Sequence, residues 1–193
     1  MPYADLATLK AMLGITDTSR DSLLEAALDA ASASIDQRCG RTFAMDVTPS
    51  PRVFRVRGRV TPFDGGSLLL VDDIATLDEL TVETGRPGDW VEVTDAEPYP
   101  DNALDRGRPI TGLVRPFWPT SAQVRVTAVW GWPAVPEPVV QATLLQASRL
   151  YRRKDSPEGV AGSAEWGLIR VPGLDPDVRA LVEPYRLPGF GGF

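Results

Sequence analysis

The chain has 193 residues, a hydrophobic content of 43% and a formal net charge of −6. This hydrophobic content is enough for a folded core and excludes global disorder. The acidic balance argues against a general nucleic-acid-binding protein, whose surface would be broadly basic. Because the apolar runs are too short to span a bilayer and the N-terminal segment lacks the layout of a signal peptide, we expect a protein of the cytoplasm, or of an assembly built there.

Histidine is absent from the chain, and Cys39 is the single cysteine. The lack of histidine excludes Ser-His-Asp and Cys-His nucleophile systems together with imidazole metal sites. Cys39 has no partner for an internal disulfide, and its position suggests a small apolar residue at a helix end. We therefore expect no catalytic residues, no metal site and no cofactor.

Residues 1–40 are predicted to form an N-terminal helical hairpin. The first helix covers about residues 4–13, where leucines recur at helical spacing, and it ends at Gly14. The second helix runs to about Cys39, and Gly40 provides a C-terminal stop. Its alanines indicate close packing against another helix.

Residues 41–132 change to a period of two and are predicted to form a β-rich insertion, a small antiparallel sandwich or barrel-like lobe. The run SLLLV at 67–71 reads as a buried strand, and we assign the following Asp72-Asp73 to a turn. The other strand candidates are 53–57, 80–83, 90–93 and 123–130.

Helical patterning returns in residues 133–173, which are assigned to a third helix and the loop after it. Residues 174–193 are assigned to a short C-terminal helix and a tail. The predicted fold class is thus α+β: a small four-helix bundle with a β-rich insertion between helices 2 and 3 and an extended C-terminal tail. The predicted bundle core consists of Leu24, Leu28, Ala31, Ile35, Val140, Leu144, Ala147 and Tyr151.

Two stretches of the chain resemble a known family. The segment YADLATLKAMLGITDTSRDSLLEAALDAASASIDQRCGRTF is similar to the N-terminal helices of head–tail connector (adaptor) proteins of tailed bacteriophages. The later segment WGWPAVPEPVVQATLLQASRLYRRKDSPEGV resembles the third helix of the same group. The family is identified here as that of HK97-type head-completion adaptors.

This resemblance implies a structural virion protein. Such adaptors form a ring, usually twelve-fold, under the portal protein, extend the DNA channel and dock stopper or tail-completion proteins. DNA passes through the ring without sequence-specific binding, and no membrane is involved. The implied location is the head–tail connector of a virion assembled in the host cytoplasm, with the segment at about 174–193 gripping the portal.

Candidate contact residues follow from charge and exposed apolar character. The basic end of the third helix is predicted to face a neighbouring subunit, the portal or the DNA channel, and a solvated helix end is the alternative. Apolar residues in the following loop and in the tail are predicted to order against a partner, or to fold back on the subunit. The candidates are Arg149, Arg152, Arg153, Lys154, Trp166, Ile169, Tyr185, Leu187, Phe190 and Phe193.

Other functions remain as alternatives at this stage. One is a stopper or tail-completion protein of the same connector stack, and another is a nucleic-acid-binding module that uses the basic helix end. A carboxylate-based enzyme would need two acidic groups set across a cleft, for which Asp72, Asp73, Asp78 and Glu79 are the candidates. The tryptophans near prolines, Trp118, Trp130 and Trp132, are assigned to a packed core instead of a sugar-binding platform.

Overall fold

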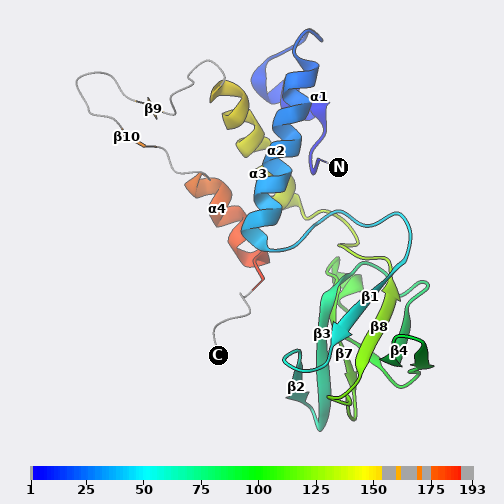
Figure 1. Ribbon diagram of the computed structural model, residues 1–193. Coiled ribbons are helices and arrows are strands. Elements are labelled where there is room, and N and C mark those ends of the chain that lie inside the picture. The colour runs from blue at the N-terminus through cyan, green and yellow to red at the C-terminus, as the bar shows by residue number, and fades with distance from the viewer. Residues whose placement is uncertain (1, 154–159, 162–168, 171–174, 188–193) are drawn as a thin grey trace. The chain divides into compact units, whose positions relative to one another are not determined.

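The computed structural model describes residues 2–153, 160–161, 169–170 and 175–187 (Figure 1). The chain divides into two units. The helical unit consists of Met1–Thr42 and Val135–Phe193, and the β unit consists of Phe43–Ala134. Each unit has its own hydrophobic core.

The helical unit contains four α-helices in the described part of the chain: α1 (Leu6–Leu13), α2 (Asp21–Cys39), α3 (Glu137–Arg153) and α4 (Pro176–Val182). A short 3-10 helix, η2 (Glu183–Tyr185), follows α4 directly, and strands β9 (Val160–Ala161) and β10 (Ile169–Arg170) pair in an antiparallel manner. Asp5 caps the start of α1 by accepting a hydrogen bond from the Thr8 backbone N–H at 2.7 Å. Helix α2 ends at Gly40, whose φ of 68° gives it a left-handed conformation that glycine adopts without strain.

The core of the helical unit lies between α1, α2 and α3. Ala27 and Ala31 of α2 lie in one buried cluster with residues of α3, and such small side chains allow two helices to approach closely. Helix α4 packs mainly on α3 and buries Val178 and Val182 completely. The buried core of α1, α2 and α3 consists of Ala4, Leu9, Leu24, Ala27, Leu28, Ala31, Leu144, Ala147 and Tyr151, with Val140 packed partly against it. Ile35 is also fully buried.

The prediction of a four-helix bundle with a β insertion is wrong. The fold is a β-rich α+β fold with two antiparallel four-stranded sheets, and its four described helices do not form a bundle. The reason is length: α1 has 8 residues and α4 has 7, so at about 1.5 Å per residue neither can run beside the 19 residues of α2. The described helices thus form one long pair, α2 and α3, with a short helix packed at each end. The predicted tail, 188–193, lies outside the described residues.

The β unit is a sandwich of two sheets, here named A and B. Sheet A has the strand order β1 (Ser50–Arg55), β8 (Gln123–Ala128), β4 (Thr81–Arg86) and β5 (Asp89–Glu92). Sheet B has the order β2 (Val60–Phe63), β3 (Gly66–Ile74), β7 (Ile110–Arg115) and β6 (Glu97–Tyr99), and the 3-10 helix η1 (Leu104–Arg106) precedes β7. Both sheets are antiparallel throughout.

Alternating side chains build the sandwich core. In β8, Val124, Val126 and Ala128 are fully buried, while the residues between them are only partly covered. Strand β1 contributes Phe54, and its ring lies 5.9 Å from that of Trp130. Period-two patterning therefore identifies the inner face correctly in these strands.

The assignment of Asp72-Asp73 to a turn is wrong, because β3 continues through both residues to Ile74. Adjacent strand residues point to opposite faces, so the two carboxylates have different surroundings. Asp72 is ion-paired with Arg52 at 2.9 Å. Asp73 is only 9% exposed and accepts a hydrogen bond from Trp132 Nε1 at 3.0 Å.

In the ranges that the structure describes, no helix is both long and apolar enough to cross a membrane.

Candidate interaction surface at the base of the C-terminal segment

The predicted contact residues fall into two groups. Lys154, Trp166, Phe190 and Phe193 lie outside the described residues, and Ile169 belongs to β10, where only its backbone is described. The remaining candidates lie on α3 and after α4: Arg149, Arg152, Arg153, Tyr185 and Leu187.

Arg149 lies within the helical unit and joins α3 to the start of α4. Its Nη1 donates to Asp175 Oδ2 at 3.1 Å, and Asp175 is the N-cap of α4, accepting the Asp177 backbone N–H at 3.0 Å. The structure does not bring Arg149 together with the other two arginines in one contact. Arg152 is exposed and Arg153 is half-buried, and neither makes an ion pair with another residue that the structure describes.

The C-terminal segment returns to the end of α2. The backbone N–H of Leu187 donates to the carbonyl oxygen of Cys39 at 2.8 Å. The last carbonyl groups of a helix have no partner within the helix, so this bond satisfies one of them with a residue from the other end of the chain. Gly40 lies beside this bond: an added Cβ there would be at ordinary contact distance, 3.8 Å, from the Leu187 Cβ.

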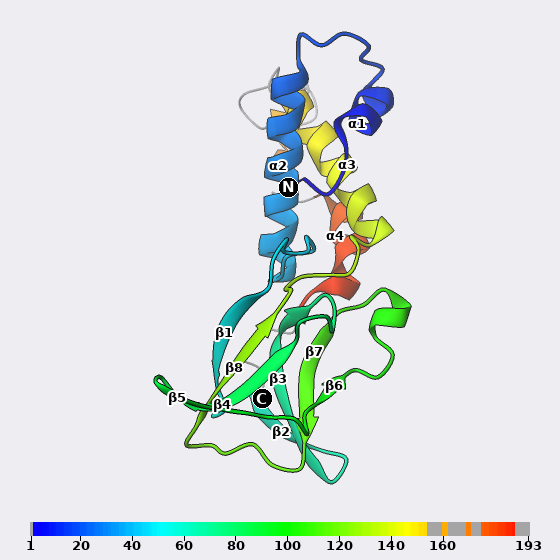
Figure 2. The ribbon, with the colours of Figure 1, turned by 90° about the vertical axis from the view of Figure 1, so that its right-hand side faces the viewer.

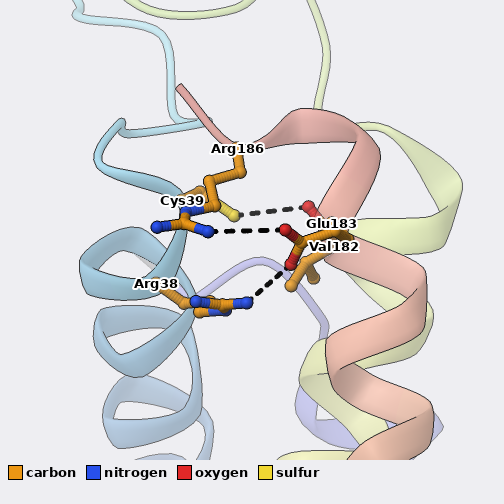
Figure 3. Close-up of polar contacts among 5 residues, drawn as sticks. All are labelled: Arg38, Cys39, Val182, Glu183 and Arg186. Carbon is orange, nitrogen blue, oxygen red and sulfur yellow. Dashed lines mark hydrogen bonds and ion pairs between the residues drawn. The ribbon is translucent and has the colours of Figure 1, made fainter. Parts of the chain in front are cut away.

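Ion pairs and a buried thiol surround this bond (Figure 3). Arg38 Nη2 donates to Glu183 Oε2 at 2.6 Å, and Arg186 Nη1 donates to Glu183 Oε1 at 3.5 Å. The Cys39 Sγ donates to the Val182 carbonyl oxygen at 3.7 Å. We name this set the C-terminal clasp: Arg38, Cys39, Val182, Glu183, Arg186 and Leu187.

The clasp combines a buried apolar part with an exposed polar part. Cys39 and Val182 have 0% exposure, whereas the Glu183 side chain is 49% exposed. Burial raises the pKa of Cys39 to about 11, so the thiol is protonated at neutral pH and can donate to Val182. Exposed ion pairs contribute about 0.2–1 kcal/mol each, so burial of Val182 and Cys39 dominates the stability of the clasp.

The arrangement fixes the position of Leu187 within the helical unit. Leu187 is held by its backbone to α2, while its side chain is 36% exposed. Any segment that follows Leu187 must therefore start from the C-terminal end of α2. The clasp joins the backbone of the C-terminal segment to the last turn of α2.

The acidic candidates for an enzyme take part in contacts that stabilise the β unit. Asp72 and Asp73 are engaged by Arg52 and Trp132, as described above, and Asp78 Oδ2 accepts from the Thr76 hydroxyl at 3.1 Å. Within the described part of the chain, no group of three His, Cys, Asp or Glu side chains is placed to hold a metal ion.

The three tryptophans are buried in the β unit, each with a different polar partner. Trp118 Nε1 donates to the Leu113 carbonyl at 3.2 Å, and Trp130 Nε1 donates to the Ser50 carbonyl at 2.8 Å. Trp132 donates to Asp73 and lies 5.2 Å from the ring of Phe43. Their exposed fractions of 1%, 1% and 4% leave no aromatic face for a sugar platform.

Sequence reasoning missed most of the clasp. Arg38 and Glu183 are 145 positions apart, and Cys39 and Val182 are 143 apart. A local pattern cannot reveal such a pairing. The available signals were Gly40, which ends α2, and Pro184, which lies in η2 directly after α4.

The fold is one found in the neck of gene transfer agent (GTA) particles. It is similar to a chain in the "Neck of empty GTA particle computed with C6 symmetry", with a TM-score of 0.56 and 21% identity over 98% of this chain and 93% of that chain. A chain in the "Virion of native gene transfer agent (GTA) particle" gives 0.56 and 20% over the same shares. A chain in the "Neck of native GTA particle computed with C12 symmetry" gives 0.51 and 20%, over 98% and 92%.

The sequence also matches one protein-family model over part of its length. Residues 3–60 match the family model described as phage gp6-like head-tail connector protein, a range that spans α1, α2 and β1. The resemblance to phage head–tail connector proteins is thereby confirmed. No curated protein matches the chain.

Proposed function

We propose that the protein is a structural head–tail connector of a phage or phage-like virion and acts as the head-to-tail adaptor. In this role it forms a ring under the portal protein, extends the DNA channel and docks stopper or tail-completion proteins. The observation that carries the proposal is the connector-family match over residues 3–60 within a fold that, over 98% of the chain, is similar to neck proteins. The virion is assembled in the host cytoplasm.

Its two-unit organisation supports a role between partners. The helical unit and the β unit each have a separate core, so each can present a surface of its own. The charged groups that would suggest catalysis are used in internal contacts, as for Asp72 with Arg52. This supports a non-enzymatic protein.

The clasp supports a portal-binding role for the C-terminal segment. It holds Leu187 at the end of α2, so the residues that follow begin at a defined position. A tail that orders on binding loses conformational entropy, and a fixed starting point reduces that loss. We assign the portal contact to the segment from Leu187 onward, including Phe190 and Phe193.

The acidic balance supports passage of DNA without retention. A channel lined by many arginines and lysines would bind the phosphate backbone and slow its movement, because each neutralised phosphate adds affinity. The net charge of −6 disfavours such binding. Arg152 and Arg153 are assigned to a neighbouring subunit, the portal or the channel.

Mixing the purified protein with portal rings of the same particle tests the proposal. Negative-stain images should show composite rings in which a second layer lies on one end of the portal. Bare portals beside free subunits, at all protein ratios tested, would contradict the adaptor function.

Truncation tests the assigned portal contact. Ending the chain after Leu187 keeps the whole clasp, so the melting temperature should be unchanged while portal binding is lost. Ending it after Tyr185 removes the Leu187–Cys39 bond as well and should also lower stability. Full portal binding by the chain that ends at Leu187 would show that the tail is not the portal contact.

A further inference from the structure

Charge is separated along the sequence of the β unit. In residues 50–59 every charged side chain is an arginine: Arg52, Arg55, Arg57 and Arg59. In residues 89–101 every charged side chain is acidic: Asp89, Glu92, Asp95, Glu97 and Asp101. We name these the basic segment and the acidic segment.

Topology places the two segments on opposite edges of both sheets. In sheet A, β1 of the basic segment is one edge strand and β5 of the acidic segment is the other. In sheet B, β2 follows the basic segment directly and is one edge, while β6 of the acidic segment is the other. Figure 2 shows β1 and β6 on opposite sides of the β unit. We call the β1 and β2 edges the basic side and the β5 and β6 edges the acidic side.

Internal ion pairs neutralise only part of each side. Arg52 and Arg59 share Asp72, at 2.9 and 3.9 Å, and Asp95 pairs with Arg115 at 2.9 Å. On the basic side, Arg55 and Arg57 remain exposed. On the acidic side, Asp89, Glu92 and Glu97 remain exposed. None of these five makes an ion pair with any residue in the described part of the chain.

Each side also carries an exposed aliphatic residue on its edge strand. Val53 of β1 is 52% exposed, and Val91 of β5 is 61% exposed. A contact that covers them would bury apolar surface, which charge attraction alone does not provide.

Prolines in the edge strands oppose continuous backbone pairing between copies. Pro51 lies in β1, Pro62 in β2 and Pro98 in β6, and a proline cannot donate a ladder hydrogen bond. Strand β5 has no proline but only 4 residues. Edge strands of this kind resist open-ended sheet extension, so contact between side chains is favoured over a merged sheet.

We propose that the basic side of one β unit binds the acidic side of the next copy of this chain. The contact is heterologous, because two different surfaces meet, and a heterologous contact produces a closed ring when its rotation closes. The inference rests on the ring assembly of the proposed function and adds the surface through which neighbouring subunits meet.

Charge reversal tests the contact in the full chain. Arg55→Glu with Arg57→Glu puts two exposed carboxylates on the basic side, and Asp89→Arg with Glu92→Arg puts two exposed cations on the acidic side. Each variant alone should self-associate at least about tenfold more weakly than the wild type in sedimentation at 0.1 M salt. An equimolar mixture of the two should recover association, because opposite sides meet again. Raising the salt to 1 M shortens the Debye length from about 10 Å to about 3 Å and should weaken the wild-type contact.

A matched control changes the same amount of charge elsewhere. Glu25 and Asp29 are exposed on α2, and replacing both with arginine should leave self-association unchanged. Equal loss in this control and in the β-unit variants would mean that net charge, not the proposed sides, governs association.

Cross-linking detects the contact even when it is weak. In a Cys39→Ala background, chains with Val53→Cys and chains with Val91→Cys are treated with a flexible bifunctional maleimide. Neither should form dimers alone, their mixture should form dimers, and a chain with both cysteines should form a ladder of oligomers. Absence of the ladder, or equal dimer formation by Val53→Cys chains alone, would overturn the proposal.

The results separate the interface from the adaptor function. Composite portal rings that form normally with both charge-reversed variants would overturn the interface and leave the adaptor function standing. A ladder from the double-cysteine chain, without any composite ring on the portal, would support the interface and contradict the adaptor function.

Discussion

Val182→Ala should raise the population of the open C-terminal clasp more than Glu183→Ala, which removes the carboxylate of Glu183. Val182 is fully buried between α4 and the end of α2, and the substitution removes two buried methyl groups. At about 0.8 kcal/mol for each group, the clasp loses about 1.6 kcal/mol, which raises the population of the open form about 15-fold.

Removing the Glu183 carboxylate should have a smaller effect. Its bond to Arg38 joins side chains that are 49% and 28% exposed, and its bond to Arg186 joins side chains that are both nearly half exposed. Only the bond to Arg38 joins the C-terminal segment to α2, and solvent screening limits its loss to about 0.2–1 kcal/mol, or about 1.4- to 5-fold more of the open form.

Cys39 is the natural probe of this opening, because it is the single cysteine and is fully buried in the closed clasp. Its labelling rate by a thiol reagent at fixed pH should rise about 15-fold for Val182→Ala and less than about 5-fold for Glu183→Ala. Arg179 is exposed on the same helix, and Arg179→Ala should not change the rate. Wild-type labelling rates in both clasp variants, or a larger effect of Glu183→Ala, would refute the reasoning.

Three further predictions concern stability. Burial raises the pKa of Cys39 from the usual 9.0 to about 11, so the unfolded chain loses this proton first and the free energy of unfolding should fall as pH rises from about 9 to about 11. A Cys39→Ala chain should lack that part of the fall in a denaturant series. At Gly131, φ is 112° and an added Cβ would lie 2.0 Å from a carbonyl oxygen, so Gly131→Ala should cost at least about 3 kcal/mol in thermal unfolding. Gly14→Ala, with nothing within 4 Å, should cost about 1 kcal/mol, and equal costs would contradict the clash. Trp132→Phe leaves the buried Asp73 without its indole donor and should cost about 1–3 kcal/mol, whereas an unchanged melting temperature would show that the bond contributes nothing.

Helices and buried strands with local signals were predictable from the sequence. Gly14 and Gly40 mark the ends of α1 and α2 because both adopt left-handed conformations there. The run SLLLV lies within β3, where Leu68 and Leu69 are buried. Strands β2, β6 and β7 were missed because Pro62, Pro98 and Gly112 interrupt the alternating pattern.

The arrangement of these elements was not predictable from periodicity. An apolar stripe shows that a helix packs on something, but four stripes do not show that four helices meet. In the same way, the basic end of α3 indicated contact residues, yet Arg149 finds its partner in Asp175, which a local pattern cannot identify. The edge strands of the β unit follow from pairing order, which joins residues as distant as Ser50 and Ala128.

That last pairing has a consequence for how the protein can change. Because β1 and β8 are neighbours in sheet A, and Asp46 N–H bonds the Trp130 carbonyl at 2.8 Å, the chain enters and leaves the β unit at almost the same point. Residues 43–134 are thus an insertion whose first and last residues lie close together. Such an insertion can be lengthened, shortened or exchanged without changing the distance between the two chain ends that connect it to the helical unit. A change in the length or sequence of the β unit can therefore leave the packing of α2 against α3 unaltered.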